Sequence, residues 1–171
     1  CALPISDFAI SAKRTSGEYM PLVDKLRGPT AWLTWQQGKT DAQSTGYSGE
    51  WFTAFTNTGA TLGADNSGGQ AVNSSGTSII QYYFQRAPSF MDVVCYSGTG
   101  VLGNTQTHNL GAVPELMIIK RRNSTGNWTV YTAATGNTAA LYINASDAVY
   151  TGDVNYRSEE HTSELQSLRH L

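Results

Sequence analysis

Short apolar segments separated by turn-forming residues constrain the fold of this chain more than any other feature. Eight such segments are rich in β-branched and aromatic side chains, which favour strands. They span residues 7–13, 30–36, 50–56, 77–85, 90–97, 115–121, 127–133 and 139–145. Runs of Gly, Asn, Ser and Thr lie between them and favour turns, because Gly and Asn accept positive φ angles.

Helical periodicity is not sustained anywhere in the chain. The best helical candidate, MPLVDKLRG at residues 20–28, is short and is equally compatible with an irregular strand. The sequence therefore predicts an all-β fold whose antiparallel sheets are arranged like a sandwich.

The composition excludes several classes of protein. Hydrophobic residues make up 40% of the chain and charged residues 14%, which is too apolar and too weakly charged for a disordered protein. The formal net charge of −2 gives no reason to expect nucleic-acid binding. No apolar run approaches the roughly 20 residues that a membrane-spanning helix needs, so we expect no membrane insertion.

The two ends of the chain differ in character from the rest. RSEEHTSELQS at 157–167 resembles the translation of a common short-read sequencing adapter, and CALPI at 1–5 resembles the translation of its reverse complement. A frayed terminal helix, a disordered tail and a metal site at His161 with Glu160 or Glu164 are the alternatives, but a metal site needs more ligands. We interpret residues 1–5 and 157–171 as adapter-derived and exclude them from functional inference, which implies an environmental (metagenomic) fragment.

An internal repeat is visible when residues 12–33 are compared with residues 119–141. Lys13, Arg14, Tyr19, Val23, Gly28, Thr30, Ala31 and Leu33 correspond to Lys120, Arg121, Trp128, Tyr131, Gly136, Thr138, Ala139 and Leu141. The repeat period is about 108 residues. We therefore expect two partial copies, a C-terminal part at 6–87 and an N-terminal part at 88–156. The two parts could pack on each other, because each alone leaves apolar faces open.

Motifs with catalytic or cofactor-binding potential are weak. Gly98, Gly100 and Gly103 form a literal GxGxxG, but a dinucleotide site needs a helix directly after it, and the following residues predict a turn. His108 has no local partner for general-base catalysis, which favours a hydrogen-bonded structural role. Cys95 alternates with apolar residues and is expected to pack as a small hydrophobic side chain. The acidic residues are scattered along the chain, so we expect no catalytic, cofactor-binding or metal-binding residues and no enzymatic activity.

Aromatic and polar residues in the strands and turns offer a second set of candidates. Trp32, Trp35, Trp51 and Trp128 could contact a ligand by stacking on sugars, although a β-core needs the same residues. The basic cluster at 120–122 is expected to solvate a strand end and protect a sheet edge. Asn73, Asn123, Asn127 and Asn144 begin N-x-S/T sequons, for which we expect turn and edge roles.

An ordered set of motifs resembles a known family. It comprises FQRAPSFMDVVCYSGTG, THNLGAVPELMIIKRR, NWTVYT and ALYINAS, together with TLGADNSGGQAVNSSGTSIIQYYF at 61–84. These segments resemble a domain of unknown function found in virion structural and tail-fibre-like proteins of tailed phages, many of them marine. The resemblance covers nearly all of residues 7–156. Cys95 stands where the family commonly has Thr, and TSIIQYYF departs from its usual Tyr-x-Ala-aromatic pattern.

The resemblance implies a non-enzymatic structural protein of a phage virion, such as a tail fibre or adhesion component. Its implied partners are other virion proteins, a host surface glycan or protein, and further copies of itself in a fibre. The implied location is the extracellular phage tail. A virion-associated glycan-degrading enzyme and a purely architectural spacer are the alternatives.

Overall fold

The computed structural model describes residues 6–14, 19–35, 40–46, 49–66, 72–101, 104–136 and 139–151. Within these ranges the chain forms strands and no α-helix. The strands are β1 (Phe8–Lys13), β2 (Pro21–Asp24), β3 (Gly28–Thr34), β4 (Phe52–Thr56), β5 (Gly59–Leu62), β6 (Ile79–Phe84), β7 (Leu116–Ile119), β8 (Thr129–Thr132) and β9 (Leu141–Tyr142). All paired strands are antiparallel, which confirms the predicted fold class.

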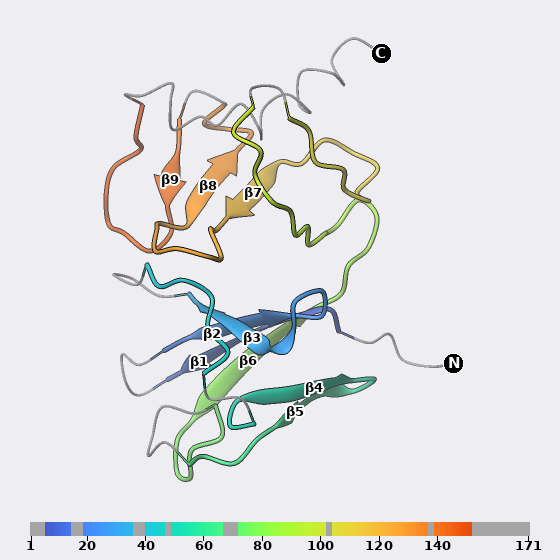
Figure 1. The fold of residues 1–171 in the computed structure, drawn as a ribbon, viewed down its shortest axis with the longest axis vertical. Helices are drawn as coiled ribbons and strands as arrows, with labels where there is room; N and C mark the ends of the chain where they lie inside the picture. Colours follow the sequence, from blue (N-terminus) through green and yellow to red (C-terminus); the bar gives the residue numbers. More distant parts are fainter. Residues whose placement is uncertain are drawn as a thin grey trace.

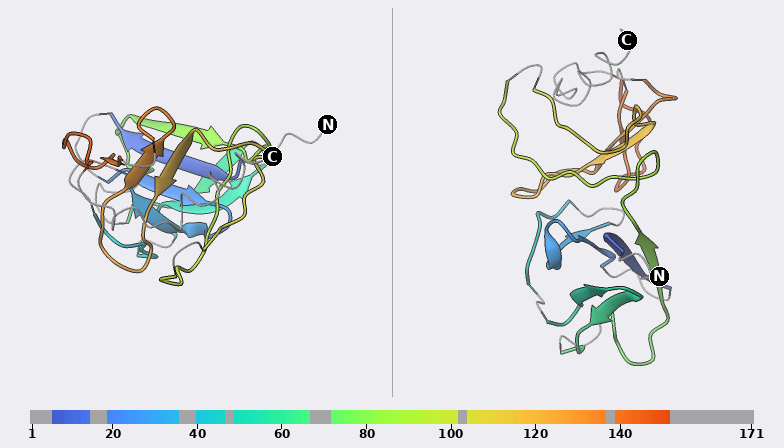
Figure 2. Two further views of the ribbon diagram at one scale, coloured as in Figure 1. Left: turned by 90° about the horizontal axis from the view of Figure 1, so that it is seen from above. Right: turned by 90° about the vertical axis from the view of Figure 1, so that its right-hand side faces the viewer.

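The strands form two units that lie one above the other along the longest axis of the molecule (Figures 1 and 2). The first unit contains a four-stranded sheet of order β3-β2-β1-β6, here called the first sheet, and the hairpin β4-β5. The second unit, residues 85–151, contains a three-stranded sheet of order β7-β8-β9, here called the second sheet. Between β6 and β7, the described residues 85–101 and 104–115 are irregular apart from the pairing of Ala87 with Met91.

The first sheet and the hairpin enclose the larger core. Ala9, Val23, Trp32, Trp51, Phe52 and Val72 are buried in it, with Tyr19, Phe55, Ala60 and Leu62 packed around them. The ring centroids of Trp32 and Trp51 are 4.4 Å apart, and the Trp32 indole N–H donates to the Gly46 carbonyl at 2.7 Å. Burial of an aromatic side chain of this size stabilises a fold by roughly 3 kcal/mol, so this pair is a main source of stability in the first unit.

A second core lies on the opposite face of the first sheet and joins the two units. Leu22 and Leu33 are buried there together with Trp128 from the second unit, and Phe8, Ile10 and Trp35 pack against them. Side chains alternate between the faces of a strand, so a strand whose sheet has a core on each face is buried at successive residues. This explains why all four residues of β2 are buried.

The hydrogen-bond registers of the two sheets coincide at an offset of 108 residues. The pairs Phe8↔Asp24, Ile10↔Leu22 and Pro21↔Thr34 of the first sheet match Leu116↔Thr132, Ile118↔Val130 and Thr129↔Tyr142 of the second. The turns also match, because Gly28 and Gly136 both have positive φ angles, of 94° and 71°.

This register refines the sequence comparison between residues 12–33 and residues 119–141. At the offset of 108 residues, Val23, Gly28 and Leu33 correspond to Tyr131, Gly136 and Leu141, the same residues that the sequence comparison aligns. Trp128, however, occupies the position of Met20 rather than that of Tyr19, because Trp35 N–H donates to the Met20 carbonyl as Ile143 N–H donates to the Trp128 carbonyl. The aromatic ring that joins the units therefore has no aromatic counterpart in the first unit.

Two predictions about local structure need correction, and one strand was missed. Residues 90–97 are not a strand, and only Met91 pairs there, with Ala87. Cys95 is exposed rather than packed as a hydrophobic side chain. Residues 92–97 form no strand because a strand needs a neighbour, and they have no partner strand among the described residues. Strand β5 was not predicted. The adapter-derived interpretation of residues 1–5 and 157–171 concerns residues outside the described ranges.

Gly63 follows β5 at a point where two backbone segments meet. A Cβ atom there would lie 1.8 Å from the Gly49 carbonyl oxygen. We expect Gly63→Ala to lower the free energy of unfolding by at least about 2 kcal/mol, measured by urea denaturation, because the backbone of Gly49 would have to move. Gly76→Ala is the control, since its Cβ meets open space and only the positive φ costs about 1 kcal/mol. Equal losses in both variants would contradict this account.

Candidate functional site

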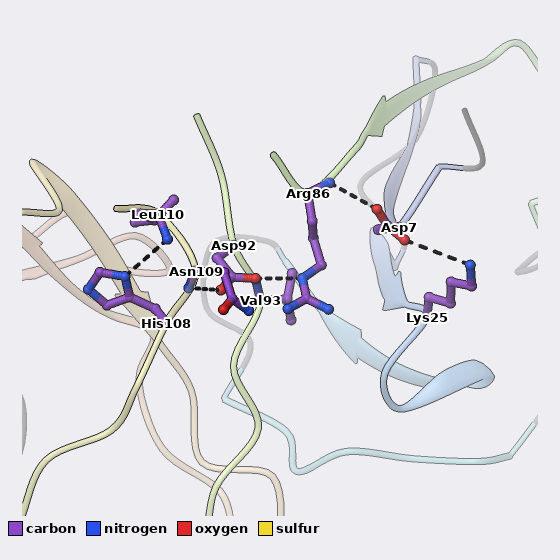
Figure 3. A network of polar contacts seen from close by, with 8 residues as sticks. All are labelled: Asp7, Lys25, Arg86, Asp92, Val93, His108, Asn109 and Leu110. Carbon is purple, nitrogen blue, oxygen red and sulfur yellow. Dashed lines mark hydrogen bonds and ion pairs between the residues drawn. The ribbon is translucent and has the colours of Figure 1, made fainter. Parts of the chain in front are cut away.

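The segment that leaves β6 forms a network of polar contacts (Figure 3). A tight turn at residues 87–91, closed by the pairing of Ala87 with Met91, brings Arg86 back towards Asp92. Arg86 Nε donates to Asp92 Oδ1 in an ion pair, and the Asp92 side chain is buried. Figure 3 shows Arg86 between Asp92 on one side and Asp7 on the other.

The Asp92 carboxylate accepts hydrogen bonds from three parts of the chain. Besides Arg86, the backbone N–H of Val93 donates to Oδ1 at 2.9 Å, and the backbone N–H of Asn109 donates to Oδ2 at 2.7 Å. Desolvation alone would raise the pKa of Asp92. The bonds from Asn109, Arg86 and Val93 favour the ionised form, outweigh that effect and lower the pKa.

His108 and Asp7 extend this network at its two ends. His108 Nδ1 accepts the backbone N–H of Leu110 at 3.3 Å, a structural role of the kind expected from the sequence. Asp7 Oδ2 accepts the backbone N–H of Arg86 at 2.9 Å, and Asp7 precedes β1 of the first sheet. The network therefore ties the turn at 108–110 to the connecting segment, and the connecting segment to the first sheet.

A second polar contact joins the units near Trp128. The Lys120 ammonium donates to the carbonyls of Thr40 and Gly126 at 3.0 and 2.8 Å. Burial lowers the pKa of Lys120, an effect that Asp41 opposes. The basic cluster was expected to solvate a strand end, but Lys120 instead bridges the units, while Arg121 and Arg122 are exposed.

The candidate ligand-contacting tryptophans are mostly core residues. Trp32, Trp51 and Trp128 are buried, and Trp35 is half-buried with its ring 5.4 Å from that of Trp128. The Trp128 indole N–H donates to the Thr34 carbonyl at 2.7 Å. The exposed aromatic residues lie elsewhere, and Tyr82 on β6 is the clearest of those on a strand, at 49% exposure.

The sequence predicted only a turn or edge role for Asn144, but its side chain also forms buried hydrogen bonds. Its side chain is buried, and its Oδ1 accepts the backbone N–H of Trp128 at 2.7 Å. Its Nδ2 donates to Asn127 Oδ1 at 3.1 Å. Asn127 and Asn144, which both begin sequons, therefore hold the backbone at Trp128. Asn73 Nδ2 similarly donates to the Gly63 carbonyl.

These contacts are those of a structural junction. The Asp92 carboxylate is occupied by a cation and two backbone donors, which leaves it poorly suited to accept a proton from a substrate. Among the described residues, no group of three or more His, Cys, Asp or Glu could hold a metal ion. The described residues that follow the GxGxxG sequence, 104–110, form no helix. No helix in the described ranges is long and apolar enough to cross a membrane.

The lowered pKa of Asp92 predicts a pH-dependent stability. A carboxyl whose folded pKa lies below its unfolded value, near 3.9, stabilises fully above that value and loses its contribution as the pH falls through the folded pKa. We expect Asp92→Asn to lower the free energy of unfolding by about 1–3 kcal/mol at pH 7, and the difference from wild type to shrink below about pH 4. Urea unfolding from pH 2 to 7 measures this, and a difference that is constant across the range would contradict it.

Comparison with known proteins places the second unit in a family. The family model described as "Domain of unknown function (DUF7483)" matches residues 85–170. The match begins at the residue before Arg86, contains the whole Asp92 network apart from Asp7 and Lys25, and extends into the C-terminal residues interpreted above as adapter-derived. No curated protein and no solved structure matches the chain. The match covers half of the 171 residues, and the chain therefore belongs to the DUF7483 family of domains of unknown function.

Proposed function

We propose that the chain is part of a non-enzymatic structural protein of a phage virion, a tail-fibre or adhesion component that presents β-units at the host surface. The phage context rests on the family resemblance of the motifs at 61–84 and 84–146. The junction between the units is the structural observation that carries the proposal.

The junction favours a rigid arrangement of units. Trp128 is buried against the face of the first sheet that lies opposite the larger core. The Lys120 ammonium adds hydrogen bonds to backbone carbonyls of both units. Two backbone hydrogen bonds also join the units. Gln43 N–H donates to the Arg122 carbonyl, and Gly126 N–H donates to the Thr40 carbonyl. Units joined by buried apolar surface and backbone bonds move together, as the elements of a fibre must.

The common register supports the interpretation that the units are partial copies of one repeat of about 108 residues. Repeated β-units that each contact the next form extended, soluble arrays. Such an array would have other virion proteins as partners, and it would place exposed loops and strand edges towards a host surface glycan or protein.

Tyr82 is our candidate for contact with a glycan, because an exposed aromatic ring on a strand is a rigid stacking surface. The test applies the labelled chain to an array of bacterial surface glycans. We expect binding that Tyr82→Ser weakens about ten-fold and that Tyr150→Ser, the matched control with a ring exposed to 39%, leaves unchanged.

Other outcomes of the array experiment would contradict the proposal. The absence of binding to every glycan would contradict surface recognition and favour an architectural spacer. Release of reducing ends from the arrayed glycans would contradict a non-enzymatic role and favour the glycan-degrading alternative.

A further inference from the structure

Strand β7 lies at one edge of the second sheet. Among the described residues it pairs only with β8, in a continuous register without a bulge. Its four residues, Leu-Met-Ile-Ile, carry no charge, and Leu116 and Ile118 are 56% and 37% exposed. Natural edge strands are usually protected from pairing by charges, prolines or bulges, none of which is present within β7.

The equivalent strand of the first sheet shows what covers such an edge. Strand β1 is matched to β7 by the common register, and β6 pairs with it along its whole length. The Phe8 ring lies 5.8 Å from that of Phe84, and Ile10 lies opposite Tyr82. Residues directly opposite each other share a face of the sheet, so apolar side chains on β1 are covered by aromatic ones from β6.

The backbone groups of β7 are oriented for the same pairing. In an antiparallel sheet, successive residues of a strand direct their hydrogen-bonding groups to alternate sides. Lys25 N–H donates to the Asp7 carbonyl, and Ala133 N–H donates to the Glu115 carbonyl. The odd-numbered residues of β1 and β7 therefore bond to β2 and β8. Leu116 and Ile118 therefore direct their N–H and C=O groups to the open edge.

We propose that β7 is the acceptor site for one antiparallel β-strand with the chemistry of Ile79–Phe84, that is, uncharged with aliphatic and aromatic side chains at alternate positions. The incoming strand places its equivalent of Phe84 opposite Leu116 and its equivalent of Tyr82 opposite Ile118, as β6 does on β1. The second sheet then has four strands in the order of the first. Affinity comes from main-chain hydrogen bonds and specificity from the alternate apolar side chains.

The test uses the full chain and a fluorescent peptide of residues 77–86, TSIIQYYFQR. Fluorescence anisotropy is expected to show saturable binding. Ile118→Pro should weaken it at least about ten-fold, because it removes an N–H that faces the open edge and leaves the bonds to β8 in place. Ile118→Val is the matched control and should bind like wild type.

Modified peptides test the same edge without altering the protein. In β6 the even-numbered residues bond to β1, since Arg14 N–H donates to the Ser78 carbonyl in the same ladder. N-methylation of the peptide at Ile80 and Tyr82 should therefore abolish binding. N-methylation at Gln81 and Tyr83, whose N–H groups face away, should preserve it.

Amide hydrogen exchange locates the bound peptide. Leu116 and Ile118 should exchange more slowly in the complex, while Met117 and Ile119 should not change. Absence of saturable binding, binding that Ile118→Pro leaves unaffected, or protection of another strand would overturn the proposal. A dimer that Ile118→Pro converts to a monomer, with no binding of the peptide, would overturn it too, because the occupant would then be a second copy of the chain.

Discussion

Replacing Trp128 with alanine is expected to lower the free energy of unfolding by about 3–5 kcal/mol, the largest loss for any single residue of the second unit. Trp128 is 4% exposed, and its indole packs on Leu22 and Leu33 and donates a hydrogen bond to the Thr34 carbonyl. The substitution removes the ring that joins the units and leaves a buried carbonyl without its donor. Urea unfolding, followed by the fluorescence of the remaining tryptophans, measures the loss.

Two further results distinguish the loss of the junction between the units from a general loss of packing. Trp128→Phe should recover part of the loss, because it refills the cavity but cannot donate to Thr34. The alanine variant should also unfold in two transitions, since the units lose their shared core. A single transition with a loss below about 1 kcal/mol would show that Trp128 does not couple the units.

The buried pair of Asp24 and Arg27 gives the second large effect. Both side chains are 3% exposed, Arg27 Nε donates to Asp24 Oδ2, and the Arg27 backbone N–H donates to Asp24 Oδ1 at 2.9 Å. Asp24→Ala is expected to cost about 3–5 kcal/mol in urea unfolding, because it leaves the guanidinium buried without a counter-charge.

A double variant distinguishes the cost of an unpaired charge from that of lost packing. Asp24→Leu with Arg27→Met replaces the ion pair by apolar side chains and should be clearly more stable than Asp24→Ala. Lys25→Ala in the same turn is the control and should change the stability by less than about 0.5 kcal/mol, because its contact with Asp7 is exposed and 4.0 Å long. A double variant as unstable as Asp24→Ala would contradict this account.

Local pattern predicted most of the strands, because side-chain alternation and turn residues act within a few positions. Strands β1, β3, β4, β6, β7, β8 and β9 all lie within or overlap the predicted segments. The segment at 90–97 has the same pattern but is not a strand, since pairing depends on a neighbour that may come from anywhere in the chain. Gly59–Leu62 was missed because it is short and poor in bulky residues.

The site could be predicted only in part, because its contacts join residues far apart in sequence. Trp128 and Thr34 are 94 positions apart, and Asp92 and Asn109 are 17 apart. The motifs that contain Asp92 and Asn109 were visible in the sequence, but the hydrogen bond between these two residues was not. The exposed position of Cys95 also follows from tertiary structure, since an alternating segment buries one side only when a sheet receives it.

The register of the second sheet is the most direct test of this account, since the proposed repeat and the open edge of β7 both depend on it. In antiparallel sheets the Hα atoms of non-hydrogen-bonded pairs are close, because their Cα atoms are about 4.5 Å apart. We predict Hα–Hα nuclear Overhauser contacts between Leu116 and Thr132 and between Ile118 and Val130, matching those of Phe8 with Asp24 and Ile10 with Leu22. Contacts displaced by one or more residues in the second sheet, with those of the first in place, would contradict it.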